Sequence, residues 1–559
     1  MKILSLHCDY IKFKAVKKAL KEPEKLSEAD KKEKQIKEVL VIFTAVEKGD
    51  KTATELVKNI EDIAKQVKTK NIVLYPYAHL SSQLSSPDTA VNILKQAEAK
   101  LKKKLSVTRA PFGYYKQFEL KCKGHPLAEL SREITETGET KEAKYDYKQL
   151  LREISKTRLD RLKLKENDHR ILGQQMDLFS FNETAPGMVF WHNNGLIIKN
   201  ELIKFWREEH QKEGYEEIST PQIMDKKLWQ VSGHWEKYSE NNFVTEYEKR
   251  PFLIKPMNCP GGMLVYKTRP RSYKELPMKV GELGVVHRQE LSGVLAGLFR
   301  VIQFTQDDAH IFCTEEQIEP EIIKVMKLVD KFYKKFKLPY QIELSTRPKK
   351  RIGSDKMWDK AEKALGNVLK KQKVKFKLNK GEGAFYGPKI DFHVKDSLGR
   401  TWQCATIQLD FSLPERFDLT YIGEDNKRNR VTMLHRVIYG AIERFIGILL
   451  EHTKGHLPTW LTPVQAKVIS FTNRNKKTAE KILNQLKEAG IRAESDFEDK
   501  TINNKVREAE LQKIPYIITI GDKEEKNKTI AVRKNSKTKF GVKVEKFIKD
   551  IKQEIEERK

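Results

Sequence analysis

Apolar residues in the first part of the chain form two short continuous runs and two longer segments in which they recur every three or four positions. The continuous runs predict strands covered on both faces, and the periodic segments predict helices. The strands are expected at 39–46 and 71–76, and the helices at 53–68 and 88–104. Residues 3–6 predict a further strand, which runs into a basic helix before residue 20. This alternation predicts an α/β domain at 1–132.

The pattern changes after this domain. Residues 133–184 are polar and charged, and they predict a helical linker with a loop at 135–142 and a helix at 145–164. Residues 185–460 hold strand-like runs, most of the tryptophans and the densest Gly, Pro and His, which predicts a large α+β domain. The elements expected inside it are a helix at 202–212 that leads to a strand ending at Pro221, strands at 284–290 and 299–312, and one helix at 433–445.

A strand and helix alternation returns at 461–559 and predicts a second α/β domain. Its expected strands are 466–471 and 514–520, and its expected helices are 477–489 and 544–558. The chain is therefore expected to be a multidomain α/β and α+β protein.

The charge suggests a class of partner. Lys and Arg total 107 against 78 Asp and Glu, which gives a net charge of +29 over 559 residues. Such a surplus is typical of proteins that bind nucleic acid. Lysines that coat solvated helices would produce the same excess, so from charge alone both explanations stay open.

The apolar runs and the cysteines indicate where in the cell the protein is expected. The longest apolar stretches fall far short of the ~18–20 residues that span a bilayer, and the N-terminus lacks an apolar segment of secretory length. The five cysteines include no CxxC pair, which argues against a disulfide framework and a self-contained zinc module. We expect a cytoplasmic protein without membrane association.

Three segments of the large domain could carry chemistry: 214–221, 284–312 and 433–445. In the second, Arg288 and Arg300 stand on apolar flanks, where a guanidinium needs a carboxylate or a phosphate. An internal ion pair with Glu290 or Asp307 is the alternative. In the third, Arg444 follows a pair of small residues and could reach a polyphosphate, although helix packing explains the small residues equally well.

In this order the three segments resemble motifs 1, 2 and 3 of the class II aminoacyl-tRNA synthetases. Further stretches are similar to the threonyl-tRNA synthetases, from about residue 168 to the C-terminus: 187–195, 255–260, 304–310, 385–389, 402–404, 408–411 and 458–461. The resemblance implies a class II antiparallel-sheet catalytic domain and a homodimer formed through it. It also implies ligation of L-threonine to threonine tRNA through a threonyl-adenylate made from ATP.

The resemblance implies roles for individual residues. Arg288 would hold the α-phosphate and the threonine carboxylate, Glu290 the adenine, and Arg300 and Arg444 the polyphosphate with Mg²⁺. The remaining implied residues are Gln403 for ATP, Met257, Gln306, Asp308, Tyr386 and Gln408 for threonine, and Lys389 and Tyr386 beside Arg288 and Arg444 in the catalytic centre. Positioning and charge neutralisation account for such a transfer without a protein nucleophile.

The resemblance also implies one Zn²⁺ per subunit, held by Cys259, His310 and His435. The spacing of these residues alone would not reveal a site. One thiolate and two imidazoles leave an open coordination position, which the amino group and hydroxyl of threonine would fill while Asp308 accepts from that hydroxyl. Valine lacks the hydroxyl and is excluded. Serine is not, because one missing methyl is worth only ~1–3 kcal/mol.

A proofreading site is therefore expected. Residues 75–82, 110–116 and 122–130 resemble the archaeal-type editing domain of the same family, which is similar to D-aminoacyl-tRNA deacylases. The resemblance implies hydrolysis of mischarged seryl-tRNA, with His79, Tyr115, Lys116 and Glu129 as the editing residues. Without it, Lys116 would be taken for a solvated surface charge.

The last hundred residues resemble the anticodon-binding domain of class IIa synthetases, which implies that Arg507, Glu524 and Arg533 read anticodon bases. The sequence departs from the family's pattern at three positions. Asp499 stands where some members have Asn, Ile302 where bacterial relatives have Arg, and Ala441 where they have Ser.

Three other interpretations are alternatives to a complete, self-editing ligase. An inactive paralogue that binds tRNA or mRNA, or a hydrolase that only edits, would be expected to lose the polyphosphate and zinc residues. A seryl- or prolyl-tRNA synthetase would lack the zinc set around Cys259. All three arginines and all three metal ligands are present, which favours the ligase.

Overall fold

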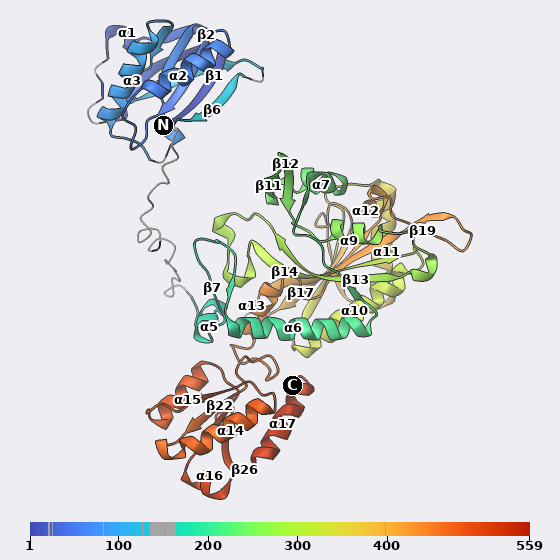
Figure 1. The fold of residues 1–559 in the computed structure, drawn as a ribbon. Coiled ribbons are helices and arrows are strands. Elements are labelled where there is room, and N and C mark those ends of the chain that lie inside the picture. Colours follow the sequence, from blue (N-terminus) through green and yellow to red (C-terminus); the bar gives the residue numbers. More distant parts are fainter. Residues whose placement is uncertain are drawn as a thin grey trace. The chain divides into compact units, whose positions relative to one another are not determined.

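The computed structural model describes residues 1–20, 23–24, 26–81, 83–125, 127–134, 151, 164–396 and 399–559. The chain divides into unit 1, Met1–Asp146, and unit 2, Tyr147–Lys559 (Figure 1). The loop expected at 135–142 lies outside the described residues, as does almost all of the linker helix expected at 145–164. Among the described helices, none is both long and apolar enough to cross a membrane.

Unit 1 is built on one sheet with the strand order β4-β3-β2-β1-β5, and β6 pairs with β1. Its strands are β1 Lys2–Lys18, β2 Lys34–Ala45, β3 Asn71–Pro76, β4 Ser106–Arg109, β5 Tyr114–Cys122 and β6 Glu129–Glu133. Helices α2 Thr54–Gln66 and α3 Pro87–Leu101 cover one face of the sheet (Figure 1). The strands and helices expected at 39–46, 71–76, 53–68 and 88–104 are thus confirmed, with small shifts at their ends.

The basic helix expected before residue 20 is wrong, because the whole segment is strand β1. Ile11 and Phe13 are buried while Lys14 is exposed, so the residues follow the two-residue period of a strand. The strand is central and pairs with β2 on one side and with β5 and β6 on the other. These ladders satisfy the backbone of a segment whose lysines suggested a solvated helix.

Unit 2 contains an eight-stranded, mostly antiparallel sheet in the order β16-β15-β17-β18-β21-β14-β13-β9. The strands are β9 Glu216–Glu217, β13 Met278–His287, β14 Gln303–Cys313, β15 Tyr340–Ser345, β16 Phe376–Asn379, β17 Lys389–Lys395, β18 Thr401–Asp410 and β21 Thr432–Val437. Helices α6 Asn193–Lys212, α10 Ile318–Lys335, α11 Asp355–Lys371 and α13 Ile442–His452 pack with the sheet in one core. The short helix α9 Cys259–Tyr266 packs in a second core with Val280, Phe312 and Met433.

The single helix expected at 433–445 is also wrong. Residues up to Val437 form strand β21, and the helix α13 begins only at Ile442. Strand β21 lies between β14 and β18, and all six of its residues are buried. A strand buried on both faces shows no two-residue alternation, so its sequence could not be distinguished from that of a buried helix.

The C-terminal part of unit 2 has a five-stranded sheet in the order β23-β22-β24-β25-β26. The strands are β22 Ala466–Ser470, β23 Ala493–Asp496, β24 Tyr516–Ile520, β25 Ile530–Lys534 and β26 Lys537–Val542, and the helices are α14 Lys476–Glu488, α15 Ile502–Leu511, α16 Asp522–Asn527 and α17 Val544–Glu556. All four elements expected here are present. The multidomain α/β and α+β fold predicted from the sequence is confirmed.

Candidate active sites

A cavity of about 280 Å³ lies in unit 2 beside the central strands of the large sheet. Neighbouring strands supply many of its walls, since Gln408 of β18 pairs with His435 of β21, and His435 with His310 of β14. Twelve of the residues singled out in the sequence line it: Met257, Cys259, Arg288, Glu290, Arg300, Gln306, Asp308, Tyr386, Gln403, Gln408, His435 and Arg444. Segments far apart in the sequence thus meet in one cavity.

Arg288 extends along the wall of this cavity. Its Nε donates to the carbonyl oxygen of Pro256 at 3.1 Å, and its Nη2 lies 3.2 Å from Met257 Sδ. The guanidinium lies 5.1 Å from the centre of the Phe304 ring. Among the described residues, no carboxylate forms an ion pair with Arg288. Its charge therefore remains available to an anion in the cavity.

The other two arginines differ from Arg288. Arg300 pairs with Glu290 through Nη2 and Oε2 at 2.9 Å, so the internal ion pair considered as an alternative is present for this arginine. Arg444 donates from Nε to the Phe299 carbonyl oxygen at 2.8 Å, and burial lowers the pKa of its guanidinium. Both arginines line the cavity together with Arg288.

Polar groups of fixed orientation also line the cavity. The Tyr386 hydroxyl donates to Gln408 Oε1 at 2.5 Å. The amide nitrogen of Asn258 lies 3.3 Å from Asp308 Oδ2, and burial raises the pKa of Asp308 to about 6. These groups are suited to a small polar ligand rather than an apolar one.

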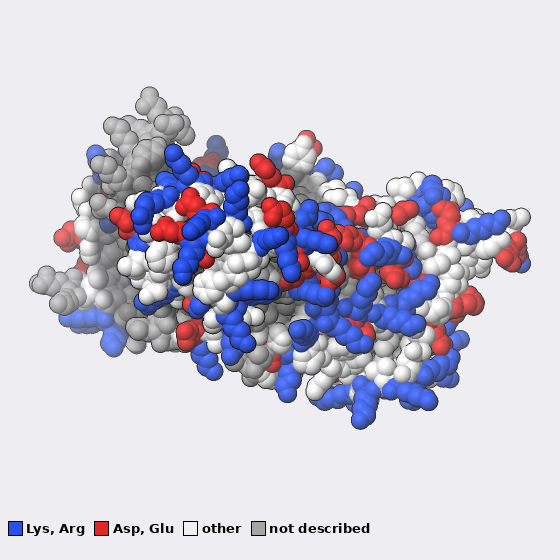
Figure 2. Space-filling view, turned by 90° about the horizontal axis from the view of Figure 1, so that it is seen from below, with Lys and Arg blue, Asp and Glu red and all other residues white. Residues whose placement is uncertain are grey.

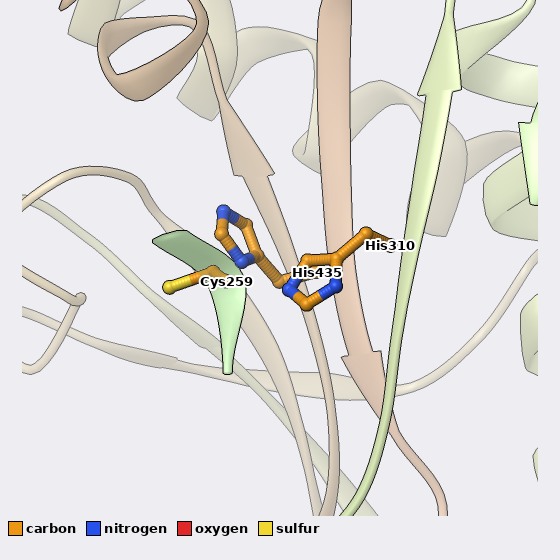
Figure 3. A group of neighbouring side chains, drawn as sticks. All are labelled: Cys259, His310 and His435. Carbon is orange, nitrogen blue, oxygen red and sulfur yellow. The ribbon is translucent and has the colours of Figure 1, made fainter. Parts of the chain in front are cut away.

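Cys259, His310 and His435 converge beside the cavity, each offering a ligand atom within 4.8 Å of the others (Figure 3). Asp410 Oδ2 lies 2.9 Å from His435 Nε2 and holds that ring. His310 is 1% exposed, and neither of its ring nitrogens has a hydrogen-bond partner among the described residues. Burial lowers the pKa of His310 and raises that of the Cys259 thiol.

An unpaired, buried imidazole is costly, and a metal ion would remove that cost. One sulfur and two imidazole nitrogens are a donor set that suits Zn²⁺. A carboxylate such as Asp410 that fixes a histidine ligand is a common outer partner of zinc sites. The residues present therefore fit the metal that the sequence implied.

Lys389 is not among the residues that line the cavity, because it pairs with the buried Asp391 at 2.9 Å. Asp391 also accepts from Ser345 Oγ at 2.7 Å and from Thr406 Oγ1 at 2.9 Å. Its fourth partner is Gln403, whose Nε2 donates to Oδ1 at 2.6 Å. Asp391 therefore orients a residue of the cavity wall, a role that no motif or spacing in the sequence indicates.

Other lining residues were missed as well. Cys404 and Thr406 of β18 line the cavity, as does Ala441, which was noted only as a departure from the family. Strand alternation from Gln408 would have identified Cys404 and Thr406, since residues two apart face the same side. Ile302, another departure, is buried.

Unit 1 has its own cavity of about 460 Å³, lined by His79, Tyr115 and Lys116 together with apolar residues. The Lys116 ammonium donates to the carbonyl oxygens of Pro111 and Tyr114, both at 3.0 Å. Burial lowers its pKa to about 8. A lysine that residue statistics alone would leave solvated is thus a partly buried group with a lowered pKa that lines a cavity.

Glu129 is not among the residues that line this cavity. It lies on β6, opposite Leu6 of β1, and its side chain is exposed. Its carboxylate raises the pKa of the neighbouring Cys122, although burial of that thiol contributes more. The structure therefore brings together three of the four residues implied for editing.

The C-terminal domain has a cavity of about 350 Å³ that Arg507 and Arg533 line. Arg533 pairs with Glu510 at 2.8 Å. Glu524 lies elsewhere, in α16, where it accepts from the backbone nitrogen of Gly521 at 3.1 Å. Asp499 is exposed in the turn before α15.

Basic side chains are spread widely over the molecule. Figure 2 shows one face on which Lys and Arg are abundant across the described surface, with acidic side chains between them. A broad positive surface suits a long polyanion better than a small anionic ligand.

Comparison with known proteins gives a family match for three parts of the chain. Residues 1–134 match the archaea-specific editing domain of threonyl-tRNA synthetase, residues 243–453 the class II tRNA synthetase core domain (G, H, P, S and T), and residues 463–554 an anticodon binding domain. The three matches follow the order expected from the sequence.

Individual proteins agree with these matches. Proteins of Clostridium tetani and Desulfatibacillum aliphaticivorans, both named threonine–tRNA ligase, are 54% identical over 395 residues, which is 70% of this chain and 62% of each relative. The chain therefore spans less than two thirds of these curated relatives. A crystal structure of the RNA binding domain of threonyl-tRNA synthetase from Cryptosporidium parvum is 40% identical, with a TM-score of 0.67 over 69% of this chain and 98% of that one. The chain belongs to the threonyl-tRNA synthetase family, with an editing domain of the archaeal type at its N-terminus.

Proposed function

We propose that this protein is a threonine–tRNA ligase that converts ATP to AMP and diphosphate and hydrolyses mischarged seryl-tRNA in unit 1. The observation that carries the proposal is an arginine without a carboxylate partner among the described residues, which lines one cavity with Cys259 and His435 of the Cys/His/His group. An inactive paralogue has no need to keep both. The named relatives support the same activity.

The arginines that line the cavity form the proposed ATP site. Arg288 has no internal counter-ion among the described residues, so it is suited to bind the α-phosphate and the threonine carboxylate that attacks it. Arg444 and Arg300 would neutralise the polyphosphate, which ATP brings with Mg²⁺. Glu290 pairs with Arg300 and would exchange that partner for the adenine amino group when ATP binds.

The Cys/His/His group and the residues around it form the proposed threonine site. Cys259, His310 and His435 would hold Zn²⁺, which when bound supplies an electrophilic position for the amino group and hydroxyl of the substrate. Asp308, oriented by Asn258, would accept a hydrogen bond from the hydroxyl of threonine. Met257, Gln306, Tyr386 and Gln408 would close the pocket around the small side chain.

Hydrolysis of seryl-tRNA is assigned to the cavity of unit 1. Two N–H groups of the Lys116 ammonium are taken by backbone carbonyls, so the third can donate to a water or to the ester in the cavity. His79 and Tyr115 line the same cavity, whereas Glu129 would need a rearrangement, or a ligand that reaches past the cavity, to take part.

The remaining assignments follow from the family. The proposed domains are 1–132 for editing, 133–184 as linker, 185–460 for catalysis and 461–559 for the anticodon. Arg507, Arg533 and Glu524 would contact anticodon bases of threonine tRNA, although Glu524 lies apart from the two arginines. We further propose a cytoplasmic homodimer formed through the catalytic domain.

An ATP–diphosphate exchange assay across all amino acids tests the proposal directly. Threonine should support rapid exchange, serine slower exchange, and valine almost none. Exchange with no amino acid would indicate an inactive paralogue or an editing-only hydrolase. Exchange with serine or proline above threonine would refute the threonine assignment.

A further inference from the structure

His169 connects a segment outside the catalytic cavity to the loop that lines it. It is the first residue of α5, His169–Gln175, and it is 1% exposed. Its Nε2 lies 2.9 Å from the backbone nitrogen of Leu298, and its Nδ1 lies 2.7 Å from Glu451 Oε1. Leu298 and Phe299 line the cavity. We infer that His169 is a positioning residue for the ATP-binding loop 297–300, an inference that rests on the proposed function.

The two hydrogen bonds of the ring determine its tautomer. A backbone N–H can only donate, so Nε2 of His169 accepts from Leu298 and carries no proton. The Glu451 carboxylate accepts, so Nδ1 carries the proton and donates. The backbone N–H of His169 donates to the same carboxylate oxygen at 3.1 Å. The neutral imidazole is thus a fixed spacer between α13, which carries Glu451, and the loop.

The loop packs directly against this ring. Gly297 has φ of +54°, and a Cβ at this position would lie 2.2 Å from His169 Nε2. The centres of the His169 and Phe299 rings are 4.3 Å apart, and Phe299 also stacks on Trp402 at 4.2 Å. The carbonyl oxygen of Phe299 accepts from Arg444 Nε at 2.8 Å. His169 therefore fixes the backbone that orients Arg444.

A metal site is the competing explanation, because ligand atoms of Asp168, His169 and Glu451 lie within 4.8 Å of one another. Each donor already has a partner in the protein. Asp168 pairs with Arg170 at 2.8 Å, Glu451 pairs with Arg400, and both ring nitrogens of His169 are engaged. The group fits a hydrogen-bonded support for the loop.

The support acts on one substrate more than the other. The carbonyl oxygen of Phe299 in loop 297–300 holds Arg444, whereas Tyr386 is held by Gln408 and packs beside His435. Loss of the imidazole should let the loop shift, and a displacement of about 1 Å can cost ~10²-fold in binding or rate. ATP binding should therefore weaken while threonine binding changes little.

Three full-length variants test this inference: His169→Ala, His169→Gln and His210→Gln. His169→Ala removes the acceptor for the Leu298 N–H, and His169→Gln restores an acceptor through its side-chain oxygen. His210 is buried in the same unit, and among the described residues its ring forms a hydrogen bond only with the Trp206 carbonyl of its own helix, so its Gln variant controls for the loss of a buried imidazole. The measurements are the KM values for ATP and threonine in diphosphate exchange, the Kd for ATP by equilibrium dialysis, and thermal unfolding.

We expect His169→Ala to raise the KM and Kd for ATP by ~10–100-fold and to change the KM for threonine by less than about threefold. His169→Gln should recover most of the ATP affinity, and His210→Gln should keep it. The inference is overturned if His169→Ala binds ATP normally, if both KM values rise together, or if a folded His169→Gln is no better than His169→Ala. Failure of wild type to exchange with threonine would refute the proposed function instead, and the dialysis arm would still decide the role of His169.

Discussion

Gln403 donates its amide Nε2 to Asp391 Oδ1 across 2.6 Å, and the same nitrogen lies 3.1 Å from Thr406 Oγ1. Both hydrogens of the amide are therefore used inside the protein, and Oε1 remains to accept from a ligand in the cavity. A hydroxyl of the ATP ribose is a suitable donor. The orientation of Gln403 depends on a carboxylate that does not itself line the cavity.

Asp391→Asn should raise the KM for ATP by about tenfold, because the new amide offers a donor where Gln403 and Thr406 also donate. The KM for threonine should change much less. Diphosphate exchange at varied ATP measures the effect. Glu343→Gln makes the same chemical change at the residue paired with Asp391 on β15, and it should behave as wild type. An unaltered KM for ATP in Asp391→Asn would refute the assignment of Gln403 to the ATP site.

Arg288→Ala should reduce threonine-dependent diphosphate exchange by at least ~10²–10³-fold, since the charge that meets the reacting phosphate is lost. Arg288→Lys should also fail, because a point charge does not replace a planar fork. Arg207→Ala removes an arginine that pairs with Glu217 on the surface, and it should leave exchange intact. Near wild-type exchange in Arg288→Ala would refute the role of this residue.

The purified protein should contain about one zinc per chain, and Cys259→Ser should lose both the metal and threonine activation. Metal analysis by mass spectrometry measures the first effect, and exchange the second. Cys313→Ser changes another buried cysteine, outside the Cys/His/His group, and should keep the zinc. Active enzyme without zinc would contradict the assignment.

Deletion of residues 1–132 should leave threonylation intact and let seryl-tRNA accumulate when serine is supplied in excess. Lys116→Ala should have the same effect in milder form, because the backbone of the cavity remains. Lys104→Ala, an exposed lysine of unit 1, is the control. If the shortened chain forms no more seryl-tRNA than the full chain, unit 1 is not the editor.

The pH dependence of editing should reflect Lys116. Its pKa is lowered to about 8 by burial, so the third N–H of the ammonium is present below this pH and lost above it. The Lys116-dependent part of seryl-tRNA hydrolysis should therefore fall as pH rises from about 7 to about 9. Deacylation rates corrected for spontaneous hydrolysis would show this decline. The same decline in Lys116→Ala would assign it to another group.

Most elements could be predicted from the sequence because their periodicity survives in the fold. Residues 71–76 were expected as a strand, and β3 has these bounds. The prediction for the segment before residue 20 was wrong because its lysines obscured the two-residue alternation of Ile11 and Phe13. The prediction of a helix at 433–437 was wrong because a strand buried on both sides has no solvent-exposed face to produce an alternating pattern.

The residues of the candidate site likewise fall into those that could be predicted from the sequence and those that could not. Arg288, Cys259 and Lys116 were accessible through resemblance, since their segments are distinctive. Asp391 and His169 were not, because their roles depend on partners that only folding brings close. His169 and Glu451 are 282 positions apart, and no spacing rule connects them.

The unpaired imidazole of His310 bears on how such an enzyme would respond to metal shortage. If the site holds zinc as proposed, the apo protein carries on strand β14 a buried ring whose nitrogens have no hydrogen-bond partner among the described residues. That protein would be less stable as well as inactive, and cells clear unstable chains. Zinc starvation would then lower the amount of the enzyme and would not leave an active enzyme with altered amino-acid selectivity. A shortage of zinc would therefore slow translation without raising its error rate.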